Sequence, residues 1–242
     1  MSEHFAIPAT TFVLKAIIEA RLRIAYGGFT PPKVSTEPPP RPAPASSGNQ
    51  TSEPPSLILF MHHASANPAW RNMYDPHVDG MGNRSAKAPL VLDLHYLLAA
   101  LGSDIEREAI LGVGMSALHR NGIVPRPMIQ QILGAIAVPA NPTRLMDSLT
   151  GERLHDPANQ PESITISQHP LDVDMSTKLW SAFQSPIRPC AYYLVTTLFL
   201  DPGETFTAPT PVDSVVIASR PVVDPAADPA NDDVLVIVEP GQ

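Results

Sequence analysis

Proline constrains this chain more than any other residue type, because it interrupts both helices and central strands. The sequence holds 29 prolines in 242 residues, about 12% against a usual share of about 5%. They are concentrated in two places, with nine from Pro31 to Pro55 and seven from Pro202 onward. Hydrophobic residues still make up 43% of the chain. The sequence therefore predicts a folded body that carries proline-rich segments.

The charge is unevenly distributed along the chain. The net charge is −8, and residues 201–242 contain eight acidic residues and one arginine, which gives −7 and leaves −1 for residues 1–200. We interpret 202–242 as an acidic arm on a nearly neutral body, with a solvated tail that only aids solubility as the alternative. Arginine outnumbers lysine by twelve to four, and arginine is favoured at contact surfaces.

Several classes of protein are not expected. No stretch approaches the ~20 consecutive apolar residues of a membrane-spanning helix, and the N-terminus lacks the basic and apolar regions of a secretory signal. The single cysteine, Cys190, cannot form a disulfide within the chain, which favours a cytosolic compartment. No basic block is present, which argues against nucleic-acid binding as the main role.

Four segments show the periodicity of amphipathic helices. They are expected from Thr10 to Ile24, from Ser103 to Arg120, from Met128 to Ile136 and from Asp172 to Phe183. Three of them have start signals, namely Thr10 or Thr11 as an N-cap, a Ser103–Glu106 capping box and Asp172 as an N-cap. Glycines at 27 and 28 and the Asn121-Gly122 pair provide stops. The inner face of the last helix is expected to hold Met175, Leu179, Ala182 and Phe183, with Trp180 beside them.

Short β-prone runs alternate with these helices. In the body they are Leu57–Met61, Leu90–Leu98, Ile164–Ser167 and Ala191–Leu200, and a helix is the alternative for the second. Two more, Val215–Ile217 and Val234–Val238, lie in the acidic arm. These elements predict an α+β fold, with three to four helices packed on an antiparallel or mixed sheet of about four to six strands. Residues 1–201 form this domain, with residues 30–56 as a proline-rich surface loop inserted in it.

Histidines and carboxylates near the first strand raise the question of a metal site. Imidazole and carboxylate are good ligands for zinc or iron, so a metal-dependent hydrolase using His62, His77, Asp93 and His95 is the alternative function. However, no HExxH spacing is present, and adjacent residues such as His62 and His63 point to opposite faces of a strand. We therefore expect ordinary polar or half-buried histidines and predict no catalytic residue, cofactor or metal.

Other motifs also favour structural roles. The segment Gly112–Ser116 lacks the third glycine of a dinucleotide-binding motif and lies inside a predicted helix. We expect its glycines to allow close approach of a neighbouring helix or sheet. The chain has no GxSxG elbow and no P-loop. Cys190 has no histidine base beside it and is expected to be a buried thiol.

The pair Trp70 and Arg71 lies in a polar loop, away from any apolar periodicity. An exposed tryptophan beside an arginine is typical of an interface anchor. The alternative is that Trp70 folds back onto the body as part of a local core. The sequence alone does not separate these two interpretations.

Several segments resemble, in order, the N-terminal domain of the cap, or tail-terminator, proteins of phage-tail-like contractile injection systems. They are Asn67–Asn72, Pro89–Leu98, the helix ending Ala117–His119, Leu179–Phe183 and Ile187–Tyr193. The resemblance spans roughly residues 11–201 and leaves out the proline-rich insert and the acidic arm. It implies a non-enzymatic protein in the bacterial cytoplasm, as part of a particle that is released or anchored. A baseplate or adaptor component of the same particle is a further alternative.

The resemblance also implies partners. The family forms a homo-hexameric ring on the distal end of the inner tube and sheath and ends their polymerisation, without binding nucleic acid or inserting in a membrane. A β-prone segment on a linker can add a strand to a neighbour's sheet. The candidate segment for this role consists of Val234, Leu235, Val236, Ile237 and Val238.

Overall fold

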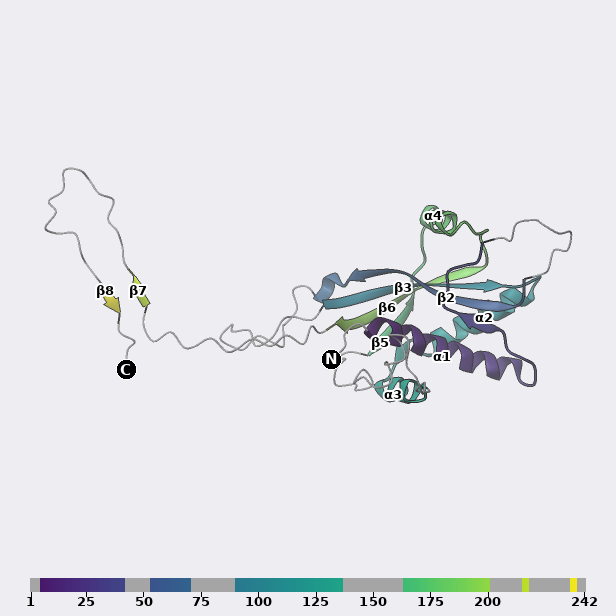
Figure 1. The fold of residues 1–242 in the computed structure, drawn as a ribbon, viewed down its shortest axis with the longest axis horizontal. Coiled ribbons are helices and arrows are strands. Elements are labelled where there is room, and N and C mark those ends of the chain that lie inside the picture. Colours follow the sequence, from purple (N-terminus) through teal and green to yellow (C-terminus); the bar gives the residue numbers. More distant parts are fainter. Residues whose placement is uncertain are drawn as a thin grey trace, which may run out of the picture.

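A computed structural model of the chain describes residues 5–41, 53–70, 90–136 and 163–200, and the two short strands 215–217 and 236–238. The body is built on a six-stranded mixed sheet with helices on both faces (Figure 1). The predicted α+β fold is therefore confirmed. None of the described helices has both the length and the hydrophobicity that crossing a bilayer requires.

The strand order in the sheet is β1-β2-β3-β6-β5-β4. The strands are β1 (Lys33–Ser35), β2 (Ser56–Ala66), β3 (Leu90–Leu101), β4 (Ile123–Val124), β5 (Ile164–Gln168) and β6 (Cys190–Leu200). Strand β1 pairs parallel to β2, and all the other pairs are antiparallel. The central strand β3 is buried at ten of its twelve positions. Such a strand needs cover on both faces, which agrees with the strand prediction for Leu90–Leu98.

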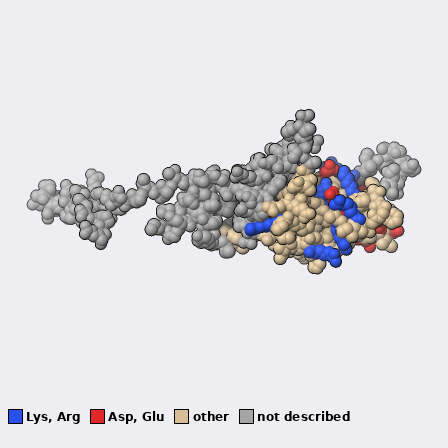
Figure 2. Space-filling model, turned by 90° about the horizontal axis from the view of Figure 1, so that it is seen from below, with Lys and Arg blue, Asp and Glu red and all other residues tan. Residues whose placement is uncertain are grey.

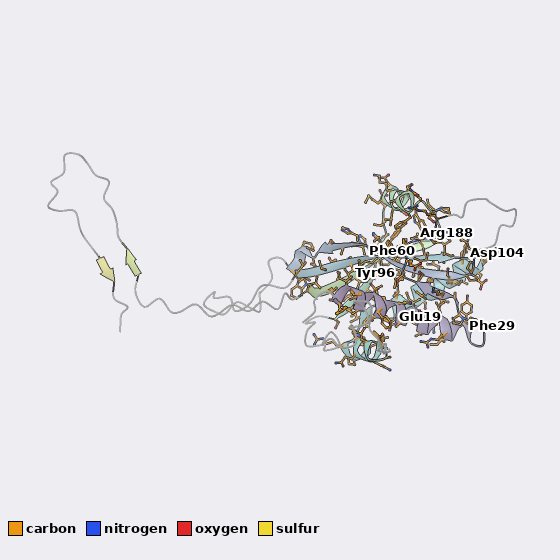
Figure 3. All side chains as sticks on the ribbon, viewed as in Figure 1. Glu19, Phe29, Phe60, Tyr96, Asp104 and Arg188 are labelled. Carbon is orange, nitrogen blue, oxygen red and sulfur yellow. The ribbon has the colours of Figure 1, made fainter. Side chains whose placement is uncertain are left out.

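Of the helices in the described part of the chain, three cover one face of this sheet and one covers the other (Figure 1). The three are α1 (Ala6–Tyr26), α2 (Glu106–Arg120) and α3 (Arg126–Gly134), and the single one is α4 (Val173–Phe183). The larger core lies between α1–α3 and the sheet, and a smaller core lies under α4. The labelled side chains of Tyr96 and Phe60 mark these two faces in Figure 3.

Helix α1 begins earlier than predicted. Its first residue is Ala6, so Thr10 and Thr11 lie inside the helix rather than at its start. Their hydroxyls donate to the carbonyls of Ala6 and Ile7, one turn back, which is how threonine is accommodated within a helix. The predicted stop is confirmed: Gly27 follows the helix with φ of +54°.

The capping box predicted for the second helix is wrong. Helix α2 begins at Glu106, its N-cap is Ile105, and no side chain caps it. Asp104 takes a positive φ of 57°, so the backbone turns sharply just before the helix. The Glu106 carboxylate instead accepts a hydrogen bond from the Tyr26 hydroxyl at 3.3 Å. The tertiary contact between α1 and α2 thus replaces the local one.

Helix α4 has the predicted cap and a different buried face. The Asp172 side chain accepts a hydrogen bond from the Val173 amide. The fully buried residue is Trp180, at 1% exposure, whereas Met175 is 56% exposed. Only part of the helix lies over the smaller core, so fewer of its residues are buried than the apolar periodicity predicted.

Both described ends of the proline-rich insert contact the body, whereas the sequence analysis predicted a surface loop over residues 30–56. Residues 33–35 form strand β1 at the edge of the sheet, which the sequence analysis did not predict. The carbonyl of Pro40 accepts a hydrogen bond from the Ser185 hydroxyl at 2.9 Å. On the other side, Glu53 forms a two-point ion pair with Arg188. Both described ends are therefore held against the segment between α4 and β6, while residues 42–52 lie outside the described part.

The β-prone runs of the arm form a separate two-stranded sheet (Figure 1). Strand β7 (Val215–Ile217) pairs antiparallel with β8 (Val236–Val238), with Val216 opposite Ile237. Two of the predicted residues, Val234 and Leu235, lie outside the described residues.

Candidate interaction surfaces

The turn that carries Trp70 is held on β3 by one asparagine. The Asn67 amide donates to the Val91 carbonyl at 2.9 Å, and its side-chain Nδ2 donates to Asp93 Oδ1 at 2.9 Å. The Asn67 side-chain oxygen also accepts from the Ala69 amide, which is a local turn motif of asparagine. These three bonds fix the start of the short 3₁₀ helix Pro68–Trp70 at the end of β2.

Trp70 is half-buried at the end of this short helix. Arg71 lies outside the described residues, so the structure does not test the pair. The sequence analysis missed the contribution of Asn67 and Asp93, because their contact depends on the pairing of β2 with β3. The interface role of Trp70 stays a prediction.

Four histidines from three neighbouring segments gather on the α4 side of the sheet; we call them the histidine cluster. They are His62 and His63 on β2, His95 on β3 and His169 after β5. The ring of His95 is central, with ring-centroid distances of 5.2 Å to His63, 5.9 Å to His169 and 6.1 Å to His62. The rings of His62 and Tyr192 also pack edge to face, with their centroids 6.2 Å apart.

A β-bulge explains why two adjacent histidines approach the same ring. The register between β2 and β3 shifts between Met61 and His63, so that Met61 pairs with Tyr96 and His63 with His95. A bulge adds one unpaired residue and redirects side chains. The expectation that His62 and His63 point apart is therefore wrong. His169 could not be assigned to the cluster from sequence, because its position depends on the hydrogen bond that its backbone N–H donates to the Tyr192 carbonyl.

Burial favours the neutral imidazole at two rings of the cluster, those of His62 and His95. Burial, followed by the neighbouring His95 and His63, lowers the pKa of His62 from 6.5 to about 4. Burial, His63 and His169 lower the pKa of His95, and Asp93 opposes this shift. The hydroxyl of Ser65 lies 3.3 Å from His95 Nε2. Packing imidazoles together without a matching set of carboxylates is costly once they are charged.

The described residues do not support the metal-hydrolase alternative. Within residues 5–41, 53–70, 90–136 and 163–200, no group of three or more histidine, cysteine or acidic side chains could hold a metal ion. Of the four residues named for that function, His77 lies outside the described part, and Asp93 accepts from Asn67. The described contacts of the cluster are contacts between packed rings.

The two glycines of α2 differ in their surroundings. A Cβ atom on Gly114 would lie 2.8 Å from Leu57 Cδ2 and 3.2 Å from Leu98 Cδ2, whereas one on Gly112 would meet nothing within 4 Å. The predicted close approach is confirmed for Gly114, where α2 packs on β2 and β3. Cys190, predicted to be a buried thiol, is a free cysteine of intermediate exposure at the edge of the smaller core.

The two ends of the β2–β3 pair expose different surfaces. Near the start of β2, Phe29 is 80% exposed and Ile105 is 70% exposed. They are held at the same end by the bond between Tyr26 and Glu106, and Figure 3 shows Phe29 and Asp104 at this end. The turn carrying Trp70 follows the other end of β2.

The helical face carries an excess of basic residues. Helices α1–α3 contain six lysine or arginine residues and three glutamates. The basic residues are Lys15, Arg21, Arg23, Arg107, Arg120 and Arg126. Figure 2, viewed from this side, shows lysine and arginine spread over the described part of the face. This positive excess contrasts with the acidic arm.

Comparison with known protein families places the chain. The family described as the Pvc16 N-terminal domain matches residues 9–214. No curated protein matches the chain. One similar solved structure is the sheath/tube terminator of the PVC extracellular contractile injection system in its extended state. Its TM-score is 0.47 at 13% sequence identity, and the alignment covers 89% of this chain and 64% of that chain. Another is the tube-terminating cap of the anti-feeding prophage, with a TM-score of 0.44, 12% identity and coverage of 83% and 58%.

This chain spans less than two thirds of the length of either of those two proteins. The family match, in contrast, extends over 206 of the 242 residues, since it runs from residue 9 to residue 214. A match of this extent includes every helix and strand of the six-stranded body except the first three residues of α1. The chain therefore belongs to the Pvc16 N-terminal domain family.

Proposed function

We propose that this chain is a structural cap, or tail terminator, of a contractile injection system. In this role six copies form a ring on the distal end of the inner tube and sheath and end their polymerisation. The observation that carries the proposal is the family match over residues 9–214. It agrees with the ordered set of segments that resembles tail-terminator domains.

A ring of identical subunits needs two different surfaces that are complementary to each other. The candidates for these surfaces lie at opposite ends of the β2–β3 pair: exposed Phe29 and Ile105 at one end and the turn carrying Trp70 at the other. The role requires surface complementarity with the next subunit, the tube and the sheath rather than a reacting group. It also requires neither nucleic acid nor insertion in a membrane. We place the assembled ring in the bacterial cytoplasm, on a particle that is later released or anchored.

The decisive experiment measures particle length in cells that lack this chain. Tubes and sheaths without a terminator are expected to have variable length, because nothing ends subunit addition, and electron microscopy measures this directly. Expression of the full chain from a plasmid should restore a uniform length. Particles of normal length in the deletion strain would contradict the proposal. Labelled chain at the baseplate end would instead identify an adaptor of the same particle.

The first proposed contact is Trp70. Trp70→Ala is expected to weaken subunit or tube contact by about 2 kcal/mol or more, as buried interface aromatics do, and light scattering of the purified protein measures the assembly. Val173→Ala serves as a matched control, because Val173 is 79% exposed on α4, away from this turn. An unchanged assembly with a lower melting temperature would show that Trp70 only stabilises its own subunit.

The second proposed contact is the arm. A hairpin of two short strands is at best marginally stable in water, so the β7–β8 pair is expected to gain from adding to a neighbouring sheet, in our proposal that of the sheath. Acidic residues around it would direct it toward a basic surface. Deleting 219–242 should leave the ring intact and loosen its hold on the sheath, as measured by cosedimentation. A truncated chain that does not fold would place β8 in the core instead.

A further inference from the structure

The histidine cluster lies where β2 is least supported. Strand β1 pairs with β2 only from Ser56 to Ile58, so among the described strands the rest of β2 is hydrogen-bonded on one side, to β3. The cluster occupies this half, with His63 opposite His95 and Ser65 opposite Asp93. The same half leads directly into Asn67 and the turn that carries Trp70. Opening it would therefore break the two bonds from Asn67 to β3.

The groups that face the cluster can be named element by element. Strand β2 contributes His62, His63 and the Ser65 hydroxyl, and β3 contributes His95 and Asp93. The segment after β5 contributes His169, and β6 contributes the Tyr192 ring, whose hydroxyl is 2.7 Å from Ser176 of α4. Asp93 is the only carboxylate that acts on His95 in this set, and its Oδ1 already accepts from Asn67.

We propose that the histidine cluster makes this half of β2 acid-sensitive, so that acidification separates it from β3 and breaks the bonds by which Asn67 holds the following turn on β3. Charge gained on His62 and His95 would lie between rings whose centroids are 6.1 Å apart, with the rings of His63 and His169 at 5.2 and 5.9 Å from His95. Of the described carboxylates, Asp93 acts on His95, and it already accepts a hydrogen bond from Asn67. The repulsion is relieved when β2 moves away and water reaches the rings. The proposal concerns the isolated chain and does not depend on the role in a particle.

The direction of the pH effect follows from the titration of the rings. In the closed sheet the pKa of His62 is about 4, and burial lowers that of His95 as well, whereas an opened strand titrates near 6.5. The open form therefore binds more protons as the pH falls below 6.5. Stability of this segment is complete above about pH 6.5 and is lost progressively as the pH falls toward 4.

Hydrogen exchange of the full chain at pH 7.5 and pH 5.0, corrected for the intrinsic pH dependence of exchange, tests this inference. Protection of peptides covering 59–67 and 91–95 is expected to fall at least about tenfold more than that of the α2 peptide 110–118, because one pKa unit corresponds to a factor of ten. Equal changes in both regions would overturn the proposal.

Variants of single histidines test whether the acid response comes from the histidine cluster. His95→Gln removes the central ring, keeps a polar partner for Ser65, and should reduce the acid response, because it removes one titrating ring and the charge that this ring places beside His62. His63→Gln, at an exposed position, should reduce the acid response. It tests the proposal if the His95 variant does not fold. His119→Gln, exposed at the end of α2, is the matched control and should respond as wild type. An acid response that is unchanged by His95→Gln or His63→Gln would contradict the assignment to the cluster.

Discussion

The two faces of the six-stranded sheet are covered to different extents. On the helical face, α1, α2 and α3 enclose a core that extends over most of the sheet. On the opposite face, α4 covers a smaller core around Trp180, and the sheet beyond it carries the histidine cluster. The comparison indicates that the helical face, with the larger core, contributes more to stability, while the other face retains the polar groups of the histidine cluster.

The largest expected effect tests whether the two cores are separate. Trp180→Ala removes the one fully buried side chain of α4 and should cost about 3–5 kcal/mol in local stability. Hydrogen exchange should show the loss in α4 and little change in α1 and α2. Leu98→Ala, also fully buried but on the helical face, is the matched control and should lower protection in α1 and α2 as well. Equal loss over both faces in the Trp180 variant would mean that the cores are one unit.

Elements with strong periodicity were predictable from sequence. The apolar run of β3 and the helical pattern of α2 appear in the structure almost as predicted, because burial on one or both faces determines which residues are apolar. The N-cap at Asp172 was also correct, since capping is a local interaction. For these elements, local sequence and tertiary packing agree.

Features that depend on partners distant in sequence were not predictable. Strand β1 is three residues long between prolines, and only its pairing with β2 defines it. The histidine cluster requires the bulge after Met61 and the placement of His169 beside β6. The capping-box prediction was wrong for a similar reason. The Glu106 carboxylate accepts a hydrogen bond from the hydroxyl of Tyr26, which lies 80 residues away in the sequence.

An intermediate effect sharpens the comparison through the two glycines of α2. Gly114→Ala places a methyl group 2.8 Å from Leu57 Cδ2 in the core of the helical face. Gly112→Ala, with open space around it, gains about 0.5–1 kcal/mol of helix propensity. The Gly114 variant should be about 1–3 kcal/mol less stable than the Gly112 variant, because overpacking a dense core forces side chains from their preferred positions. Urea denaturation measures both, and equal stabilities would show that α2 can move away from the sheet.

The smallest expected effect compares two tyrosine hydroxyls that meet helix hydroxyls on opposite faces. Tyr96 contacts Thr11 Oγ1 at 2.8 Å on the helical face, and Tyr192 contacts Ser176 Oγ at 2.7 Å on the α4 face. Both bonds are part-buried, so the difference comes from the tyrosines, which are 0% exposed for Tyr96 and 8% exposed for Tyr192. Tyr96→Phe should cost about 1 kcal/mol, as the loss of one hydrogen bond does. Tyr192→Phe should cost less, because water reaches its hydroxyl more readily.

Alkaline pH tests the burial of Tyr96, although burial raises the pKa of Tyr192 as well. Burial raises the pKa of Tyr96 to about 12, against which the Thr11 hydrogen bond acts only weakly. Because the unfolded chain releases this proton near pH 10, the stability that Tyr96 provides is complete below pH 10 and is lost as the pH rises toward 12. Burial also raises the pKa of Tyr193, so Tyr96→Phe should flatten the alkaline fall in melting temperature without abolishing it. A fall that is as steep in the Tyr96 variant as in wild type would show that the helical face opens to water before this tyrosine ionises, and would remove the main contrast between the two faces.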